Sequence, residues 1–234
     1  MKNIQIVRLE REKRKTDEDT VAEEVLLKLI LNNRFITKFS CSGNDINELI
    51  VGFLFYHQYI NDLSDIVTLN YNIESAEVHA KTEPQKPVFS EEAEFAKLTY
   101  NVKDIYQLMD KFLGMSEQFK KTGAVHSAAI ADNEGIKFSF EDLSRHNALF
   151  KILGYSITQN IMLQNKMLLL TCRITKSILD IIRKSNVTTI ISKAAPTDLS
   201  VEICRTKDIS LAGFVRGERM NIYHGENYFL SHRV

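Results

Sequence analysis

The sequence predicts an α/β protein in which helices pack on a largely parallel β-sheet. The main observation is an alternation in the C-terminal half, where short apolar segments are separated by segments of about 10 to 15 residues with apolar positions at helical spacing, as is typical of βαβ units. Hydrophobic residues make up 44% of the 234 residues, which is enough for a sizeable core. No internal repeat is evident, so a layered arrangement is favoured over a repeat architecture.

The N-terminal part begins with a charged segment and continues with two strands. Residues 8–19 are mostly charged and of both signs, so they cannot bury enough apolar area to offset the entropy of ordering. We therefore expect residues 1–20 to form a solvated extension. The next segment indicates a half-buried strand because apolar side chains alternate at Val25, Leu27, Leu29 and Leu31. The pair Asn32-Asn33 predicts a turn, and Arg34 to Ser40 predicts the returning strand.

A helix is expected to follow the second strand. The side chain of Asn44 or Asp45 can accept a hydrogen bond from a first-turn N–H, and apolar positions at helical spacing continue to about Tyr59. A second pair of strands is expected between Asp65 and His79. Together these elements predict a small N-terminal α+β domain over residues 21–80.

The middle of the chain, residues 81–115, predicts a connector between two domains. Residues 81–88 contain two of the three prolines and show no apolar periodicity, so they predict a loop or hinge. A helical region is expected from about Glu91 to Leu113.

The C-terminal domain, residues 116–234, is expected to carry most of the sheet. The expected strands cover residues 124–131, 136–140, 166–171, 188–192 and 209–215. The expected helices cover residues 145–159, 175–184 and 197–207. The segment Asn133-Glu134-Gly135 predicts the turn between the first two of these strands.

Composition excludes several classes of protein. Basic and acidic residues both number 30, and the zero net charge argues against a nucleic-acid partner. The longest apolar run, Leu49 to Tyr56, is far shorter than the roughly 20 residues of a membrane span, and the first residues lack the apolar segment of a secretory signal. Three cysteines cannot form a disulfide scaffold or a four-cysteine zinc site. We therefore expect a cytoplasmic protein without a membrane partner.

Candidate ligand-binding residues lie in loops after the expected strands, because ligands of α/β sheets bind beyond the carboxyl ends of strands. The most informative loop runs from Phe214 to Asn221. Its Arg216 and Arg219 could hold phosphate oxygens, and Gly217 between them would allow a ligand to approach closely. Asn221 could pair with the edge of a base. A charged hairpin turn that simply ends the sheet is the alternative.

Two predicted helix starts also carry polar residues. Arg145, His146 and Asn147 begin one helix, where they favour an anion or serve as capping and solvent-facing residues. Cys172 and Arg173 precede another helix, where the thiol either has thiolate character or is an inert small hydrophobe.

His126 is the residue that best tests for a metal site. It begins an apolar strand, where a satisfied core histidine is the alternative to a ligand. The zinc nucleoside deaminases carry His-x-Glu and Cys-x-x-Cys, but here Ser127 and Ala128 follow His126 and the chain contains no Cys-x-x-Cys. No His-x-x-x-His, glycine-rich phosphate loop or Gly-x-Ser-x-Gly motif occurs either. The sequence therefore predicts no zinc and no other metal site.

In order along the chain, several motifs resemble the formate dehydrogenase accessory sulfurtransferase family. The most specific are Arg145-His-Asn-Ala-Leu149 and the Phe-x-Arg-x-x-Arg-x-Asn-x-Tyr pattern of residues 214–223. The others are Cys41-Ser-Gly-Asn-Asp45, Glu48-Leu-Ile-Val-Gly52, Thr122-Gly-Ala-Val-His126, Thr171-Cys-Arg173 and Ala195-Pro-Thr197. The similarity extends over about residues 21 to 229.

The resemblance implies a deaminase-like α/β domain with a smaller N-terminal domain, and a cytoplasmic homodimer. It implies a carrier that accepts sulfur as a persulfide from a cysteine desulfurase and passes it to the molybdenum of a bis(molybdopterin guanine dinucleotide) cofactor for formate dehydrogenase. In the family, the segment that matches Phe214 to Arg219 binds the cofactor. The expected cofactor-binding residues are Phe214, Val215, Arg216, Gly217, Glu218, Arg219, Asn221, His126, Arg145, His146, Asn147, Arg173, Pro196 and Thr197.

One departure from the family concerns the persulfide cysteine. The family carries it in a Cys-x-x-Cys loop, whereas the corresponding stretch here, about Lys81 to Asp104, has no cysteine. Sulfur transfer needs a thiolate. The chain either binds the cofactor as a chaperone without sulfur transfer, or transfers sulfur through a relocated thiol, for which Cys172 is the best candidate.

Overall fold

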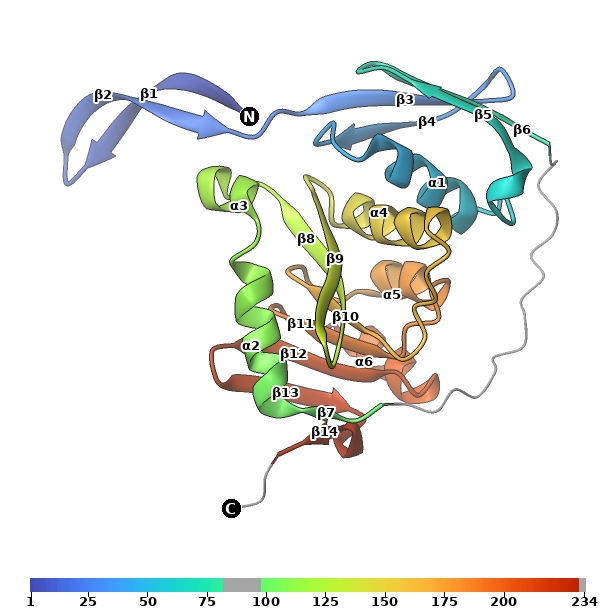
Figure 1. The fold of residues 1–234 in the computed structure, drawn as a ribbon. Coiled ribbons are helices and arrows are strands. Elements are labelled where there is room, and N and C mark those ends of the chain that lie inside the picture. The colour runs from blue at the N-terminus through green and yellow to red at the C-terminus, as the bar shows by residue number, and fades with distance from the viewer. Residues whose placement is uncertain (82–97, 232–234) are drawn as a thin grey trace.

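Two α/β bodies and a projecting hairpin make up the protein (Figure 1). The computed structural model describes residues 1–81 and 98–231. The N-terminal body is a four-stranded sheet with a helix on one face, and the C-terminal body is a six-stranded sheet with helices on both faces. The predicted α/β class is confirmed.

The first two strands form an exposed hairpin, β1 (Lys2–Glu10) and β2 (Lys13–Val21). Arg11 and Glu12 make the turn with φ values of 46° and 70°, in the left-handed region that a tight hairpin requires. The expectation of a solvated extension over residues 1–20 is confirmed for their exposure, but it is wrong for their conformation. Strands form because backbone pairing across the ribbon does not require buried side chains.

The N-terminal sheet follows the predicted alternation of side chains. Its strands, in spatial order, are β4 (Arg34–Cys41), β3 (Val25–Leu31), β6 (Ser75–Ala80) and β5 (Ile66–Tyr71). The alternating residues Val25, Leu27, Leu29 and Leu31 are buried in the core. The turn predicted at Asn32 and Asn33 is confirmed, with φ values of 48° and 63°.

Helix α1 (Ile46–Tyr56) begins where predicted but lacks the predicted cap. Asp45 precedes it with a left-handed backbone (φ 52°), and its side chain makes no capping hydrogen bond. The helix ends at Tyr56 rather than Tyr59 because the chain turns at Gln58, which has a φ of 62°. A short 3₁₀ helix, η1 (Leu63–Asp65), leads into the second pair of strands.

The C-terminal sheet is mixed rather than largely parallel. Its strands, in spatial order, are β13 (Arg219–His224), β12 (Ser210–Arg216), β11 (Thr189–Ser192), β10 (Met167–Leu170), β8 (His126–Asp132) and β9 (Gly135–Asp142). Only β10, β11 and β12 run parallel to one another. The prediction is wrong because tight turns join β8 to β9 and β12 to β13, and a tight turn can join only antiparallel strands.

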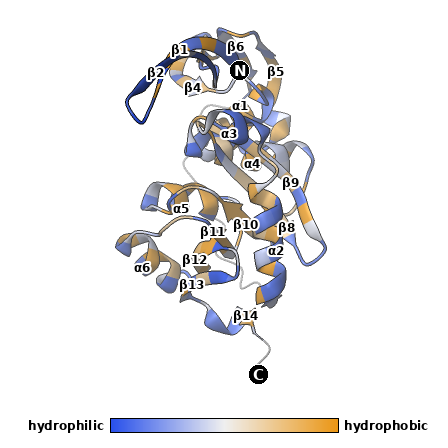
Figure 2. Cartoon of the chain, turned by 90° about the vertical axis from the view of Figure 1, so that its left-hand side faces the viewer, coloured by the Kyte–Doolittle hydropathy of each residue, from blue (hydrophilic) through white to orange (hydrophobic). Residues whose placement is uncertain are grey.

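Helices cover both faces of this sheet. Helix α2 (Val102–Leu113) packs Ile105, Met109 and Phe112 against one face. The other face is covered by α4 (Arg145–Thr158), α5 (Lys176–Arg183) and α6 (Asp198–Thr206). Figure 2 shows hydrophobic residues on the central strands and on the sides of the helices that face them. No helix in the described part of the chain has both the length and the apolar character that crossing a bilayer demands.

Several short elements are not predicted by the sequence patterns. They are β7 (Tyr100–Asn101), α3 (Glu117–Thr122), β13, η2 (Glu226–Tyr228) and β14 (Phe229–Leu230). Within the described residues, the helix of the connector is α2, which starts at Val102 after β7, the strand that pairs with β14. The predicted loop over residues 82–88 and the first part of the helix expected from Glu91 lie outside the described residues.

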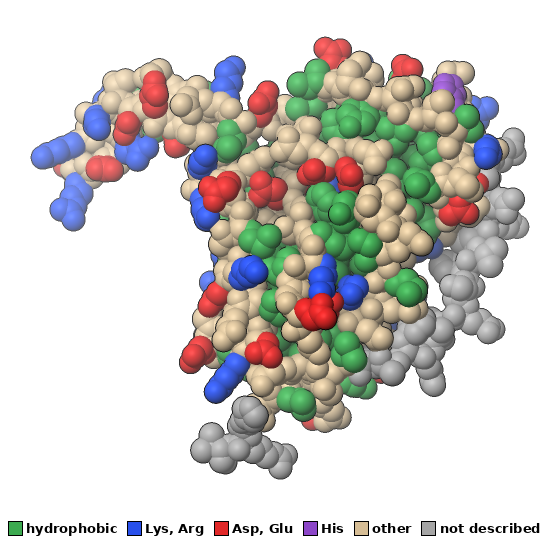
Figure 3. All heavy atoms as spheres, viewed as in Figure 1, with side chains coloured by type: hydrophobic (Ala, Val, Ile, Leu, Met, Phe, Trp, Pro, Cys, Tyr) green, Lys and Arg blue, Asp and Glu red, His purple; other side chains and the backbone are tan. Residues whose placement is uncertain are grey.

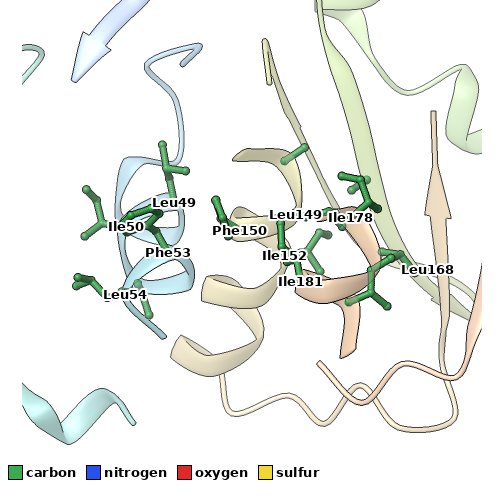
Figure 4. Packing of buried hydrophobic residues seen from close by; sticks show 14 of the residues in the cluster. Leu49, Ile50, Phe53, Leu54, Leu149, Phe150, Ile152, Leu168, Ile178 and Ile181 are labelled. Carbon is green, nitrogen blue, oxygen red and sulfur yellow. The ribbon is translucent and has the colours of Figure 1, made fainter. Parts of the chain in front are cut away.

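The helices α1 and α4 cross so closely that they join the two bodies. A Cβ on Gly52 would lie 1.9 Å from the carbonyl oxygen of Phe150, and a Cβ on Gly154 would lie 1.9 Å from that of Glu48. Figure 4 shows aromatic and aliphatic side chains filling the space beside this crossing, where the Phe53 and Phe150 rings are 5.6 Å apart. Both bodies therefore share one hydrophobic core.

A buried polar cluster, called the clasp below, lies beside this crossing and consists of Lys151, Asp142, Ser42 and Asn147. The Nζ of Lys151 is 2.8 Å from Oδ2 of Asp142, and both side chains are fully buried. Ser42 donates to Asp142 from its backbone N–H and its hydroxyl, and Asn147 donates to Asp142 and to the carbonyl of Ser40. The clasp thus ties the loop before α1 to the start of α4.

Candidate functional site

A cavity of about 250 Å³ opens at one edge of the six-stranded sheet. Thr171, Lys193 and Arg216 line it, and they lie at the carboxyl ends of β10, β11 and β12. His126 joins them because β8 is antiparallel to β10 and begins at the same edge. This cavity, called the His126 pocket below, lies where ligands of α/β sheets bind.

Hydrogen bonds between strand ends fix the backbone of the pocket. The N–H of Ser127 donates to Oγ1 of Thr171 (2.9 Å), and the N–H of Thr171 donates to the carbonyl of Ser127 (3.1 Å). The N–H of Lys193 donates to the carbonyl of Leu170 (2.9 Å). The positions of His126 and Lys193 are therefore set by neighbouring strands rather than by loose loops.

The pocket and its rim are electropositive. Lys193 and Arg216 line the pocket, while burial, Arg145 and Arg173 together lower the pKa of His126 from its ordinary value, with burial as the largest cause. His126 is therefore neutral at pH 7. In residues 1–81 and 98–231, no carboxylate forms an ion pair with these four cations, and the Nε of Arg145 is buried without a hydrogen-bond partner. Such an arrangement is suited to an anion.

Aromatic side chains also line the pocket. Phe119 of α3 is 44% exposed, and the Nζ of Lys193 lies 5.6 Å from the centre of its ring. Phe112 of α2 also lines the pocket and is buried. The pocket can therefore contact a ligand with one charged and one apolar or aromatic portion.

The hairpin between β12 and β13 brings the two predicted arginines together at its tip. Arg216 and Arg219 are register partners across the turn formed by Gly217 and Glu218. Gly217 has a φ of 52°, in the left-handed region that favours glycine, and a Cβ there would meet nothing within 4 Å. Arg216 lines the pocket, whereas Arg219 is exposed and is not among the residues that line it.

The remaining residues of this segment have different surroundings. Phe214 has an unusual positive φ of 55°, is 37% exposed, and donates its N–H to the carbonyl of Ala194. Val215 is fully buried against the core beneath α2, and Glu218 is exposed at the turn. Asn221 is half-buried beside Gly213 on the neighbouring strand. Only Arg216 of this segment reaches the His126 pocket.

Pro196 and Thr197 have structural contacts. Thr197 caps α6, because its hydroxyl accepts from the N–H of Ser200 and its own N–H donates to the Ser200 hydroxyl. Pro196 forms a bridge with Ile174 and lies close to Gly213. Neither residue lines the His126 pocket.

The three polar residues at the start of α4, residues 145–147, have different surroundings. Arg145 faces His126 closely enough to lower the pKa of that residue. His146 lies 3.1 Å from the Ser177 hydroxyl, and burial followed by Arg145 lowers the pKa of its ring. Asn147 belongs to the clasp. Only Arg145 is therefore placed beside the pocket.

All three cysteines of the chain are buried, with exposed fractions of 0% for Cys41, 3% for Cys172 and 0% for Cys204. Burial raises the pKa of Cys172 to about 11, although Arg145 and Arg173 act in the opposite direction. Burial also raises the pKa of Cys41. The structure favours the inert thiol over the thiolate at Cys172.

Lys193 and Phe119 are among the pocket residues that the sequence patterns miss. Lys193 directly follows the buried strand β11, so applying the strand-end rule to every strand would have found it. Phe119 lies on α3, a helix of six residues whose sequence is too short for a periodicity argument.

Comparison with known proteins gives a consistent result. The model of the FdhD/NarQ family matches residues 22–99 and 85–229. A sulfur carrier protein FdhD of Halalkalibacterium halodurans is 32% identical, over 88% of this chain and 87% of the relative. Another, from Bacillus pumilus, is 30% identical over 89% of each chain.

A solved structure shares the fold. A crystal structure from Desulfotalea psychrophila, described as a formate dehydrogenase accessory protein, superposes with a TM-score of 0.85 at 24% identity, covering 97% of this chain and 98% of that one. The family resemblance drawn from the sequence motifs is confirmed. The chain belongs to the FdhD/NarQ family.

Proposed function

We propose that this protein is a formate dehydrogenase accessory protein that binds the bis(molybdopterin guanine dinucleotide) cofactor through the His126 pocket and hands it over without carrying sulfur on its own thiols. The observation that carries the proposal is a group of cations at the carboxyl edge of the sheet that have no carboxylate partner among the residues that the structure describes. The accessory role is supported by the solved structure from Desulfotalea psychrophila, which is described as a formate dehydrogenase accessory protein. The relatives named sulfur carrier protein FdhD instead point to sulfur transfer, the alternative that is tested below.

The residues of the pocket fit the diphosphate of such a cofactor. Arg216 and Lys193 line the pocket, and guanidinium and ammonium groups are the usual phosphate ligands of proteins. Arg145 leaves a buried N–H without an acceptor, and a bound anion would provide one. A cavity of about 250 Å³ is small for the whole cofactor, so we assign it only one diphosphate and its neighbouring ring. When bound, the cofactor supplies the metal centre of the client enzyme.

The state of the cysteines supports handover rather than persulfide transfer. A persulfide forms when an accessible thiolate attacks a donor, and the three thiols of this chain are buried. Cys172 lies near Arg145 and Arg173, yet its pKa is raised to about 11. A cysteine desulfurase would therefore find no accepting thiol on the folded chain.

Titration with GDP tests the cofactor site. Replacing Arg216 and Arg219 together with alanine should weaken binding by on the order of 3 kcal/mol, which is about a hundredfold, because both guanidinium groups at the tip of the hairpin are removed. Arg216→Ala alone should account for most of this loss, since only Arg216 lines the pocket. The matched control is Arg34→Ala plus Arg205→Ala, which removes two exposed arginines elsewhere. Equal affinity in all of these proteins would remove the assignment.

Incubation with a cysteine desulfurase and cysteine tests the handover part. Mass spectrometry of the intact chain should detect no added sulfur atom after the reaction. A persulfide on any of the three cysteines, lost on Cys172→Ala, would establish the relocated-thiol alternative instead.

A further inference from the structure

We infer that Glu141 and Ser127 recognise the ring next to the bound diphosphate, and that they select a 2-amino-4-oxopyrimidine ring, which guanine and pterin share. Both residues line a second cavity, called the acidic groove below, which lies beside the His126 pocket. This role rests on the proposed function, because the diphosphate must be held in that pocket for the ring to reach the groove.

The acidic groove continues the His126 pocket. It has a volume of about 560 Å³, and Phe112, Ser116 and Ser127 line both cavities. Sites for small molecules usually have volumes of about 300–1,000 Å³, so the groove has room for a ring. A ligand that is held by its diphosphate in the pocket can therefore extend its ring across the shared residues.

The two cavities carry opposite charges. Lys193 and Arg216 line the pocket, whereas the charged lining of the groove consists of the carboxylates of Asp45, Glu117 and Glu141. Figure 3 shows acidic side chains over α3 and the loops beside it, beneath the projecting hairpin. The groove therefore disfavours a second phosphate and favours a group that donates hydrogen bonds.

Glu141 is the carboxylate of the groove that lacks a cation. Glu117 and Asp45 each form an ion pair with a lysine, at 2.7 Å and 3.9 Å. Within the described residues, the Glu141 carboxylate pairs with no cation and accepts a hydrogen bond from the neutral hydroxyl of Ser116. Because an ionised carboxylate can accept about four hydrogen bonds, Glu141 retains acceptor capacity for a ligand.

The Ser127 hydroxyl is nearly buried but has no partner. The residue is 7% exposed, and its backbone N–H and carbonyl both bond with Thr171. Among residues 1–81 and 98–231, no group forms a hydrogen bond with its side chain. A buried polar group without a partner costs free energy, which a bound ligand can recover. Ser127 therefore provides a free donor at the border of the two cavities.

Glu141 and Ser127 lie side by side. They are register partners on β9 and β8, and residues directly opposite in an antiparallel pair have Cβ atoms about 4.5–5.5 Å apart on one face of the sheet. The unpartnered hydroxyl and the carboxylate without a cation are therefore neighbours in the same groove.

This pair of groups matches one edge of a 2-amino-4-oxopyrimidine ring. That edge presents an acceptor oxygen, an N–H donor and an amino donor in a row. The Ser127 hydroxyl can donate to the oxygen, and the Glu141 carboxylate can accept from the N–H and the amino group. Adenine has an acceptor nitrogen in place of the N–H, so its lone pair would face the carboxylate. The groove therefore favours guanine or pterin over adenine.

Isothermal titration calorimetry of the full chain with pyrophosphate, GDP, IDP and ADP tests this selection. GDP should bind at least about tenfold more tightly than ADP, and IDP, which lacks the amino group, should lie between them. Glu141→Gln should weaken GDP binding about tenfold and leave pyrophosphate binding unchanged, while it keeps an oxygen that can accept from Ser116. The matched control, Glu134→Gln at the opposite end of the β8–β9 hairpin, should change neither affinity.

Two further measurements sharpen the test. Ser127→Ala removes the donor to the ring oxygen and should reduce the preference for GDP over ADP about threefold without changing pyrophosphate binding. Titration with 6-hydroxymethylpterin diphosphate distinguishes the two sources of the ring. The ring is guanine if Glu141→Gln weakens GDP binding more than binding of the pterin diphosphate, and pterin in the opposite case.

The selection by Glu141 is overturned if Glu141→Gln lowers the affinity for neither GDP nor the pterin diphosphate, or lowers the affinity for pyrophosphate by the same factor. Circular dichroism checks that this variant folds, and Ser127→Ala decides by the same criteria if it does not. A wild-type chain that binds pyrophosphate but shows these results keeps its diphosphate site and loses only the ring selection. A wild-type chain that does not bind pyrophosphate removes the proposed function itself.

Discussion

The clasp and the rim of the His126 pocket place cations in opposite situations. At the clasp, Lys151 is fully buried and has Asp142 at 2.8 Å, the Ser42 hydroxyl at 3.2 Å and the Glu141 carbonyl at 3.0 Å. At the rim, Lys193 and Arg216 are partly or fully exposed and have no carboxylate partner among the described residues. The fold satisfies the cation that it must bury and leaves unsatisfied those that a ligand can reach.

This contrast separates stability from binding. A buried charge that loses its partner destabilises the folded state strongly, whereas an exposed cation contributes little to folding. Substitutions at the clasp and at the α1–α4 crossing should therefore change the free energy of unfolding. Substitutions at the rim should change ligand affinity and leave folding nearly unaltered.

The largest effect is expected at the clasp. Lys151→Met leaves the carboxylate of Asp142 buried without its counter-charge and should lower the free energy of unfolding by about 3–5 kcal/mol. The matched control is Lys166→Met, because Lys166 pairs with Asp132 in a partly exposed bridge that is worth about 1 kcal/mol or less. Urea unfolding followed by circular dichroism measures both. Equal losses in the two variants would mean that burial does not distinguish the clasp.

A smaller effect is expected at the helix crossing. Gly154→Ala inserts a Cβ 1.9 Å from a backbone oxygen of α1, so the helices must separate, at a cost of about 1–3 kcal/mol. Gly114→Ala serves as the control, because a Cβ there would be 3.4 Å from its nearest neighbour and φ is an ordinary −80°. Thermal unfolding should show a clearly lower Tm for Gly154→Ala only. An unchanged Tm in that variant would show that the bodies are not held by this contact.

The smallest effect is expected at Cys172. Its side chain is buried, as the clasp is, but it lies close to Arg145 and Arg173 at the rim of the pocket. Its pKa of about 11 and its 3% exposure predict almost no reaction with iodoacetamide at pH 7.5 in the native chain, and reaction of all three thiols after denaturation. Since the thiolate is the reactive species, any native labelling should rise about tenfold per pH unit up to about pH 11. Rapid native labelling at neutral pH would instead place a thiolate beside the rim. Intact-mass spectrometry distinguishes these outcomes.

Much of the fold follows from local patterns. The period-two burial of Val25 to Leu31 and the turn at Asn32 and Asn33 are read directly from side-chain alternation and turn chemistry. The hairpin of β1 and β2 is not predicted by such patterns, because its side chains are exposed on both faces and most of them are polar. The antiparallel strand β13 is also missed, because its sequence shows no apolar alternation.

The sequence predicts the candidate site only in part, because local patterns identify the ends of strands and helices but not their tertiary contacts. The strand-end rule identifies Arg216, His126 and Arg145, because each lies at an end of a recognisable strand or helix. Arg219 and Asn147 satisfy the same rule but lie elsewhere: Arg219 is outside the pocket lining, and Asn147 serves the clasp. Position along an element does not specify which neighbour a side chain meets.

The sequence by itself determined the family, the strand and helix segments with strong periodicity, and the edge of the sheet where polar residues collect. Only the tertiary structure decided that Asn147 and Lys151 bind Asp142, that Cys172 is buried, and that Lys193 and Phe119 complete the pocket. The physical reason is that periodicity and turn chemistry act over a few residues. The contacts of Asp142 with Ser42 and of Asn147 with Ser40 instead join positions 100 and 107 residues apart.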